Sequence, residues 1–135
     1  IPKWTEALIK GKEIFINGDG ETSRDFCYIE NTVQINLLAA TTENQQATNQ
    51  VYNVAVGDRT TLNDLYEIIK DKLNDLSPLT FDLEPVFQDF RAGDVRHSQA
   101  DITKAKKLLN YAPTHKIEQG LEEAMEWYVD SLIDN

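Results

Sequence analysis

Residues 90–98 read Phe-Arg-Ala-Gly-Asp-Val-Arg-His-Ser, a stretch that places two guanidinium groups and a carboxylate within six residues. The glycine lets the backbone bend where a side chain would block close approach. A planar arginine fork can hold two oxygens of one phosphate, and Asp94 can accept hydrogen bonds from sugar hydroxyls. The stretch therefore suits an anionic ligand. The alternative is a surface turn with one exposed Arg–Asp pair, which is common and energetically minor.

Composition limits the classes of protein to which the chain can belong. It has 135 residues, enough for one domain, and a formal net charge of −10. This charge argues against nucleic acid and membrane surfaces as partners, because affinity for nucleic acid comes mostly from lysine and arginine that neutralise phosphates. No apolar run has the length of a membrane span, and the first residues lack the pattern of a signal peptide. We therefore expect a cytoplasmic protein.

The few cysteine and histidine residues bear on redox state and metal binding. Cys27 is the single cysteine and cannot form an internal disulfide, which fits a reducing cytosol. We expect it in an apolar strand as a small buried hydrophobic residue. His97 and His115 are far apart, and no cysteine or histidine partner stands at ligand spacing, so no metal site is expected.

Hydrophobic periodicity predicts an α/β chain with short strands mixed among four or five helices. Helices are expected at residues 2–10, 31–40, 62–73, 102–109 and 117–133, and extended segments at 14–16, 21–29, 51–56 and 79–87. The helix that starts near Asn31 has an almost continuous apolar surface and should be largely buried. Residues 51–56 form the strongest predicted strand, in which Asn53 is either satisfied internally or directed at a ligand.

Local signals mark the ends and faces of several predicted elements. Thr60 or Thr61 can cap the helix at 62–73, which Ser77-Pro78 should break, and Asp101 can cap the helix at 102–109. That last helix should have an apolar stripe on one side and lysines facing water on the other. In the segment at 14–16, the two isoleucines should lie on one face and the phenylalanine on the other.

Three separated motifs carry a family resemblance. They are Gly-Asp-Gly-x-x-x-Arg-Asp-Phe-x-Tyr at 18–28, Tyr-Asn-Val-x-x-Gly at 52–57 and Arg-x-Gly-Asp-Val-Arg-His-Ser-x-Ala-Asp at 91–101. Together they resemble the C-terminal half of an NAD-dependent sugar epimerase/dehydratase, an extended short-chain dehydrogenase/reductase. Within that family the chain is most similar to bacterial UDP-N-acetylglucosamine 4-epimerases of polysaccharide biosynthesis, a subfamily that also handles the corresponding uronic acids.

The resemblance implies a fold and a division of labour. Residues 1–135 would form a small mixed α/β C-terminal domain, with some strands completing the sheet of a Rossmann half absent from this chain. The family binds NAD with a Gly-x-x-Gly-x-x-Gly turn, which this sequence lacks, and it uses a Tyr-x-x-x-Lys pair for catalysis. Tyr66 and Lys70 lie on a helix better explained by packing. We therefore expect neither catalytic residues nor the NAD site here.

The resemblance also implies substrate-binding residues. Arg24 and Arg91 would contact the diphosphate of a UDP-sugar, Asp94 would accept hydrogen bonds from the ribose or the sugar, and Asn53 would lie near the nucleotide. Further candidates come from the same motifs. The backbone groups of Ile16 and Asn17 would contact the uracil edge. Tyr28 and Arg96 would act either as ligands or as structural pairs.

The expected function is the UDP-sugar-binding portion of a UDP-N-acetylglucosamine/UDP-N-acetylgalactosamine 4-epimerase, or of its uronic acid counterpart. It would retain the diphosphate while the 4-keto sugar rotates, and would be inactive alone. The intact enzyme should use NAD and form a homodimer through the missing N-terminal half. Two alternatives stay open: a fragment of another NDP-sugar epimerase or dehydratase, and a non-catalytic acidic module that binds a nucleotide or a protein.

Overall fold

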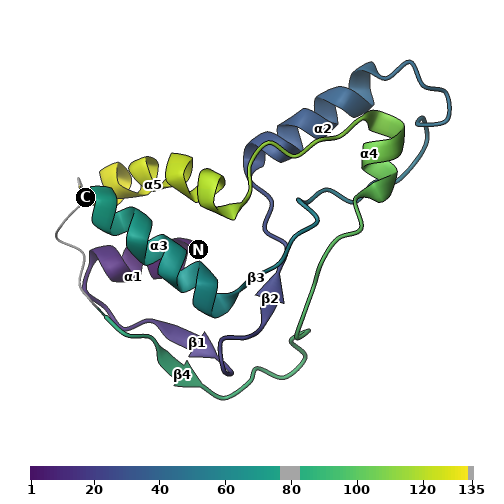
Figure 1. Ribbon diagram of the computed structural model, residues 1–135. Helices are drawn as coiled ribbons and strands as arrows, with labels where there is room; N and C mark the ends of the chain where they lie inside the picture. The colour runs from purple at the N-terminus through teal and green to yellow at the C-terminus, as the bar shows by residue number, and fades with distance from the viewer. Residues whose placement is uncertain (77–82, 134–135) are drawn as a thin grey trace. The chain divides into compact units, whose positions relative to one another are not determined.

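The computed structural model describes residues 1–76 and 83–133, which form the predicted α/β fold of helices and short strands (Figure 1). By contacts the chain divides into two compact units. Unit 1 comprises Ile1–Ser23, Thr61–Arg96 and Leu121–Asn135, and unit 2 comprises Arg24–Thr60 and His97–Gly120. The elements in chain order are α1 (Pro2–Ile9), β1 (Phe15–Asn17), β2 (Ser23–Arg24), α2 (Ile29–Thr41), β3 (Thr60–Thr61), α3 (Leu62–Leu76), β4 (Val86–Gln88), α4 (Thr103–Leu109) and α5 (Ile117–Ile133).

Unit 1 contains a parallel pair of strands, β1 and β4, in which Phe15, Ile16 and Asn17 stand beside Val86, Phe87 and Gln88. The predicted alternation along β1 is confirmed, because Ile14 and Ile16 are buried and Phe15 is exposed. Pro85 directly precedes β4, where the missing N–H of proline is tolerated. Parallel strands need a crossover connection, and α3 lies between them in the sequence.

The helix α3 begins at the cap that the sequence predicts. Thr61 Oγ1 accepts a hydrogen bond from the Asp64 N–H at 3.0 Å and donates to Asp64 Oδ2 at 2.7 Å. The first of these bonds satisfies a backbone donor that the first turn of a helix leaves unpaired. The helix packs against α1 and buries Leu65, Tyr66, Ile69 and Leu73. The predicted break at Ser77-Pro78 and residues 79–82 of the predicted extended segment lie outside the described residues.

The turn after β1 requires glycine at position 18. Gly18 has φ +81°, and a Cβ there would overlap the ring of Phe90. Gly93 has a similar φ of +86° but open space around the Cβ position. We expect Gly18→Ala to lower the free energy of unfolding by about 1–2 kcal/mol, and Gly93→Ala by about 1 kcal/mol, because both add backbone strain and only the first also displaces the exposed Phe90 ring. Chemical denaturation of both variants tests this, and equal losses would contradict a close Gly18–Phe90 contact.

Unit 2 is built around one hydrophobic cluster. The helix α2 packs against α4, and the helical stripe predicted for α4 is confirmed, with Ala105 and Leu109 buried and Lys104, Lys106 and Lys107 exposed. Asp101 Oδ1 accepts a hydrogen bond from the Thr103 N–H at 2.9 Å at the start of α4. The buried members of the cluster are Ile35, Ala47, Ala55, Ile102, Ala105, Leu109 and Tyr111.

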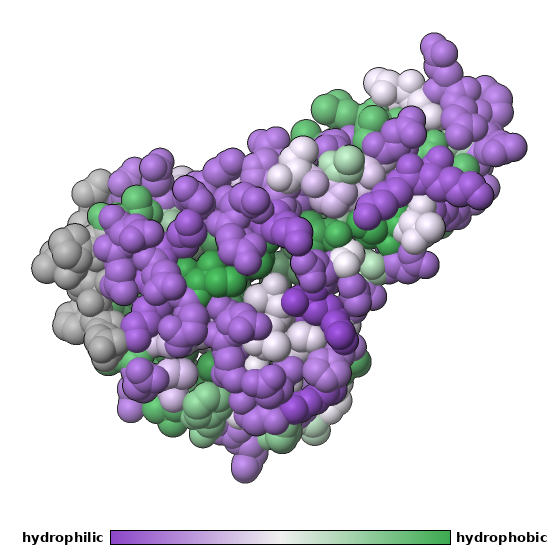
Figure 2. Space-filling model, in the orientation of Figure 1, coloured by the Kyte–Doolittle hydropathy of each residue, from purple (hydrophilic) through white to green (hydrophobic). Residues whose placement is uncertain are grey.

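The expectation that α2 is largely buried is wrong. Asn31 and Ile35 are its buried residues, whereas Ile29, Val33 and Leu37 are 61%, 45% and 61% exposed. These three apolar residues recur every four positions and therefore share one face of the helix. Figure 2 shows that the surface in view is mainly hydrophilic with apolar residues scattered across it. Although its sequence is almost continuously apolar, α2 buries one side against the rest of unit 2 and exposes another.

Two strand expectations also need correction. The described backbone has no strand at residues 51–56, and the segment predicted to be extended at 21–29 contains only β2 before α2 begins at Ile29. Cys27 consequently lies in a connection rather than in a strand, and it is half-buried. Strand formation needs a hydrogen-bonding neighbour as well as β-branched residues, and among the described residues the strand pairs are β1 with β4 and β2 with β3.

None of the helices within residues 1–76 and 83–133 combines the length and apolar character needed to cross a membrane.

Candidate functional site

The segment of residues 90–96, here called the Arg91 loop, lies on the surface of unit 1. It contains a turn in which the Asp94 N–H donates to the Arg91 carbonyl at 3.2 Å, with Gly93 at positive φ. Arg91 Nη2 donates to Asp94 Oδ1 at 3.0 Å, and the two side chains are 70% and 31% exposed. The hydrogen bond from Arg91 to Asp94 raises the arginine pKa. Arg91 and Asp94, the two predicted ligand-binding residues, therefore form an exposed ion pair, which is the alternative described in the sequence analysis. Both side chains are accessible to solvent.

A second ion pair joins the Arg91 loop to the turn after β1. Arg96 donates through Nη1 and Nη2 to the two carboxylate oxygens of Asp19, at 2.9 and 2.7 Å. Its guanidinium also lies 5.2 Å from the centre of the Phe90 ring. Hydrogen bonding from Arg96, followed by that from the Glu21 N–H, lowers the pKa of Asp19. Arg96 is thus engaged as a structural pair, one of the two roles expected for it.

The carboxyl end of β1 is open on one side. Asn17 lines a shallow pocket of about 700 Å3 with Phe87, Gln88 and Asp89. The Gly18 N–H donates to the Gln88 carbonyl at 2.8 Å and keeps the ends of β1 and β4 together. The side chain of Ile16 is fully buried, so only its backbone could meet a ligand.

In unit 2, the carboxylate of Asp25 joins segments from all three motifs. Its Oδ1 accepts from the Val56 N–H at 3.1 Å, and its Oδ2 accepts from the N–H groups of Gly57 and Ala100 at 3.0 and 3.2 Å. Hydrogen bonds to an ionised acceptor are the stronger kind. Gln99 adds a bond from its Nε2 to the Gly57 carbonyl at 2.6 Å. Residues far apart in the sequence are therefore held together by one side chain.

Arg24 and Asn53 both belong to segments that Asp25 connects. Arg24 directly precedes Asp25, lies in β2 and is half-buried. Asn53 is exposed, and its Nδ2 donates to the Asp101 carbonyl at 3.2 Å. The amide nitrogen of Asn53 is therefore satisfied within the protein, which was one of the two expectations for this residue.

Tyr28 is held at the start of α2 by packing. Its ring lies 5.0 Å from the ring of His115, measured between centroids. A Cβ at Gly120 would lie 2.8 Å from the Cβ of Tyr28, so the glycine makes room for this side chain. The neighbouring Asn31 is fully buried; its Nδ2 donates to the His115 carbonyl at 2.7 Å and its Oδ1 accepts from the Thr114 N–H at 2.8 Å. Tyr28 thus sits in a structural cluster.

The predicted site residues are divided between the two units. Ile16, Asn17, Arg91, Asp94 and Arg96 belong to unit 1. The other three belong to unit 2 and are Arg24, Tyr28 and Asn53.

Sequence reasoning missed the carboxylates of Asp19 and Asp25. The two lie inside the first motif, beside Gly18 and Arg24, where the arginine is the more obvious candidate for an anionic ligand. An acidic residue between Arg24 and Phe26 in an apolar, extended segment is a signal that could have identified Asp25, because a partly buried carboxylate needs hydrogen-bond donors.

Tyr111 lies at the centre of unit 2. It is 2% exposed, and its hydroxyl donates to the Ala55 carbonyl at 2.8 Å. Burial, with smaller contributions from Cys27 and Asp25, raises the pKa of Tyr111 to about 12. The folded state therefore retains the proton at a pH at which an unfolded tyrosine, with a pKa of about 10, has lost it.

This shift predicts a pH dependence of stability. The contribution of Tyr111 is fully present below pH 10 and should be lost as the pH rises through about 12. Tyr111→Phe should remove this dependence and lower the free energy of unfolding at pH 7 by about 1–2 kcal/mol, because the Ala55 carbonyl loses its donor. Denaturation of both proteins between pH 7 and 12 measures the difference. A difference that stays constant over this range would contradict the raised pKa.

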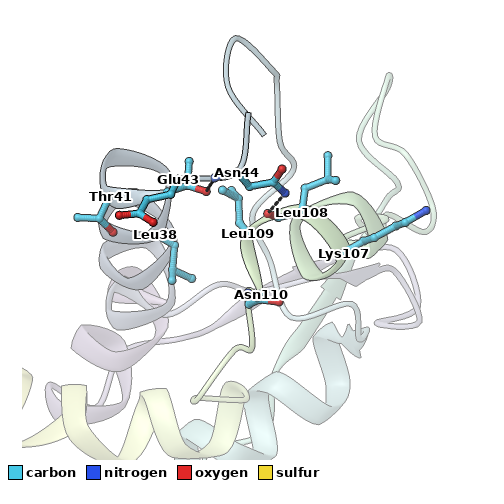
Figure 3. Close-up of a pocket in the computed structure, with 9 residues that line it drawn as sticks. Leu38, Thr41, Glu43, Asn44, Lys107, Leu108, Leu109 and Asn110 are labelled. Atoms are coloured by element: carbon cyan, nitrogen blue, oxygen red, sulfur yellow. Dashed lines mark hydrogen bonds between the residues drawn. The ribbon is translucent and has the colours of Figure 1, made fainter. Parts of the chain in front are cut away.

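A separate pocket of about 500 Å3 lies between the end of α2 and α4 in unit 2 (Figure 3). Leu38, Glu43 and Lys107 are among its lining residues, and Asn44 Nδ2 donates to the Leu108 carbonyl at 3.1 Å across one side. The predicted ligands are not among the residues that line it. The pocket is therefore separate from the motif residues.

Tyr66 and Lys70 are separated by three residues, which is the spacing of the family's catalytic pair, yet the structure supports packing. Tyr66 is 1% exposed and its hydroxyl donates to the Leu83 carbonyl. Lys70 Nζ lies 4.0 Å from Glu84 Oε1. Within the described ranges, no group of three or more His, Cys, Asp or Glu side chains is arranged to hold a metal ion.

Comparisons with known proteins place this geometry in a family. A family model described as GDP-mannose 4,6 dehydratase matches residues 1–124. A UDP-glucose 4-epimerase of Thermotoga maritima, solved with UDP-glucose, is 37% identical with a TM-score of 0.83 over 96% of this chain and 39% of that chain. A UDP-N-acetylglucosamine 4-epimerase of Methanobrevibacter ruminantium, solved with UDP-N-acetylmuramic acid, is 36% identical with a TM-score of 0.82 over 96% and 39%.

A third solved structure, MoeE5 in complex with UDP-glucuronic acid and NAD, is 25% identical with a TM-score of 0.81 over 96% of this chain and 41% of that chain. The chain spans 36% to 37% of the lengths of the first curated relatives that it matches. The family model covers nearly all of the chain, and the motifs at 18–28, 52–57 and 91–101 fall within the matched range. The chain belongs to the GDP-mannose 4,6 dehydratase family, the group of nucleotide-sugar epimerases and dehydratases that its three motifs resemble.

Proposed function

We propose that this chain is the substrate-binding C-terminal part of an NAD-dependent UDP-sugar 4-epimerase that acts on UDP-N-acetylglucosamine and UDP-N-acetylgalactosamine or on the corresponding uronic acids. The observation that carries the proposal is the junction at Asp25, which joins the first motif to Val56 and Gly57 of the second and to Ala100 of the third. Support also comes from two relatives at 36–37% identity that were solved with UDP-sugars.

The proposed binding residues are Arg24, Asn53, Arg91 and Asp94, with contributions from the backbone at Ile16 and Asn17. The arginines would hold the diphosphate, and Asp94 would accept hydroxyl hydrogen bonds. Each charge-assisted hydrogen bond contributes about 1.5–3 kcal/mol, so two arginines could supply several kcal/mol of retention. Tyr28 and Arg96 would act indirectly, because each is engaged in packing or pairing within its own unit.

Strong retention of the nucleotide serves the chemistry of 4-epimerisation. In the intact enzyme, bound NAD would supply a reversible hydride acceptor for C4 of the sugar, and the proton of the C4 hydroxyl would go to a base among the catalytic residues. The keto sugar must turn over between hydride removal and hydride return without leaving, so the protein should hold the diphosphate firmly and the sugar loosely. The NAD site and the catalytic residues would lie in an N-terminal half, which would also form the homodimer. Polysaccharide biosynthesis and a cytosolic location belong to the same proposal.

The test is an assay of the full-length protein with UDP-N-acetylglucosamine and NAD. Formation of UDP-N-acetylgalactosamine, at an equilibrium reached from either sugar, is the expected result. The 135-residue chain alone should give no turnover, because the hydride carrier would have no binding site. Conversion of UDP-N-acetylglucosamine by the isolated chain would contradict this division of labour.

A dehydratase is the second candidate, and the description of the matching family model favours it. The same assay separates the two, because a dehydratase forms a 4-keto-6-deoxy sugar and releases water instead of inverting C4. The assay should be repeated with other UDP-sugars and with GDP-sugars. If a dehydrated sugar is the sole product, the protein is a dehydratase and not an epimerase. Turnover of any nucleotide sugar would also exclude a non-catalytic binding module.

A further inference from the structure

The Arg91 loop has little burial of its own. Phe90, Val95 and Arg91 are all exposed, and Phe90 and Val95 expose 59% and 61% of their surface. Segments with few buried apolar contacts open easily, so their conformation depends on a small number of specific contacts. The contacts described here between this loop and the turn after β1 lie at the two ends of the loop.

The first end is held by Phe90 and the second by Arg96. The Phe90 ring covers Gly18, where a side chain would collide with it. Arg96 pairs with both carboxylate oxygens of Asp19, and its carbonyl accepts from the Ser23 N–H at 2.9 Å. The Arg96 guanidinium also lies over the Phe90 ring, so the two ends of the loop contact each other.

We propose that Arg96 is a positioning residue, whose bidentate pair with Asp19 and contact with Phe90 hold the Arg91 loop in the conformation that presents Arg91 and Asp94 to the substrate. This inference rests on the proposed function, because it assumes that Arg91 contacts the diphosphate. One group of contacts within unit 1 then includes the turn after β1, the Phe90 ring and the two ion pairs. The surface pair of Arg96 and Asp19 would support ligand binding indirectly.

The donor groups of the two arginines explain why their roles should differ. Arg96 commits Nη1 and Nη2 to Asp19, which fills the bidentate face of its fork. Arg91 donates through Nη2 to a single oxygen of Asp94, so its remaining N–H groups can donate to two further oxygens in a planar arrangement. Asp94 then fixes the direction of the Arg91 fork, and Arg96 fixes the loop that carries both.

We call the bidentate pair of Arg96 with Asp19 the clamp. Loss of the clamp should weaken ligand binding more than it lowers the free energy of unfolding. Exposed ion pairs contribute little to global stability, and Arg96 and Asp19 are 42% and 49% exposed. A binding-competent loop that is populated only part of the time weakens the apparent affinity by that fraction. If removal of the clamp reduces the competent population to about one tenth, the Kd for the nucleotide rises about tenfold.

The experiment measures UDP binding to the full-length protein by calorimetry for Arg96→Ala, Arg96→Lys and Asp19→Asn. Asp19→Asn is the sharper variant, because asparagine retains an oxygen for the Glu21 N–H, which bonds to Asp19 Oδ1 at 3.0 Å, but loses the charged fork. The matched control is Lys10→Ala, which removes the exposed pair of Lys10 with Glu6 in the same unit. Hydrogen exchange of the amides at 91–95 gives a readout without ligand.

About tenfold weaker UDP binding and faster exchange are expected for Arg96→Ala and Asp19→Asn, with a smaller loss for Arg96→Lys and none for Lys10→Ala. In the presence of Arg91→Ala, the second substitution Arg96→Ala should weaken binding by clearly less than tenfold further, because only Asp94 then remains to be positioned. If the double variant loses affinity by the product of the two single-variant factors, Arg96 contacts the ligand itself, and the proposal is overturned. Unchanged binding and exchange in Arg96→Ala would also overturn it.

Arg91→Ala alone separates this inference from the proposed function. If Arg91→Ala leaves UDP binding unchanged, the proposed nucleotide site is wrong. If Arg91→Ala weakens binding and the clamp variants do not, only the positioning role fails.

Discussion

Asp25→Asn is expected to lower the free energy of unfolding by about 3 kcal/mol or more. The carboxylate accepts three backbone N–H groups through its two oxygens, from Val56, Gly57 and Ala100. Asparagine offers one oxygen, and its amide hydrogens would face the remaining donors. The donors are partly buried, and a donor left without an acceptor costs about 1–3 kcal/mol when fully buried; the lost hydrogen bonds are also charge-assisted, which adds to the cost.

Chemical denaturation at pH 7 measures this loss. Glu43→Gln is the matched control, because Glu43 is an exposed acidic residue in a loop of the same unit, and its replacement should change the free energy of unfolding by less than about 0.5 kcal/mol. A change below about 1 kcal/mol for Asp25→Asn would show that the three N–H groups find other partners. The junction would then not be what holds the motif segments together.

Arg91→Ala is expected to weaken UDP binding to the full-length protein by about 10- to 100-fold, with little change in stability. One or two charge-assisted hydrogen bonds to the diphosphate, at about 1.5–3 kcal/mol each, account for this range. The Arg91 side chain is 70% exposed and pairs with Asp94, a neighbour three residues away, so the fold should depend little on it.

Calorimetric titration with UDP and with UDP-N-acetylglucosamine measures the effect. Arg59→Ala is the charge-matched control, because Arg59 is exposed and lies outside the proposed site. The two ligands should lose affinity by the same factor, since the diphosphate is common to both. A loss confined to the sugar nucleotide would place Arg91 at the sugar and contradict a diphosphate contact.

The sequence predicts the helices better than the strands, for a physical reason. The cap at Thr61 and the period of apolar residues along α3 and α4 are local signals, and the structure confirms them. Asp101 lies one residue before the N-cap position of α4, which is Ile102, and bonds to the Thr103 N–H. Residues 51–56 have the composition of a strand but lack one in the described structure. A helix satisfies its own backbone, whereas a strand depends on a neighbour that a single segment cannot specify.

The candidate site shows a similar limit. Motif order identified the Arg91 loop and the segments around Arg24 and Asn53, and the Asp25 junction joins the last two of these segments to Ala100. The carboxylates of Asp19 and Asp25 were missed because their partners are backbone N–H groups and an arginine far along the chain. Such pairs depend on the tertiary fold. The burial of α2 was overestimated because apolar sequence alone does not say which side meets a neighbour.

Each arginine of the Arg91 loop is matched by its own acid, Arg91 by Asp94 and Arg96 by Asp19. Within these two pairs the formal charges cancel, in a chain whose total is −10. Long-range electrostatic attraction therefore contributes little to the binding of an anion at the Arg91 loop, and recognition depends on short-range geometry. Inorganic phosphate and pyrophosphate should compete poorly there even at millimolar levels, which leaves the loop available to ligands that combine phosphate oxygens with hydroxyl groups.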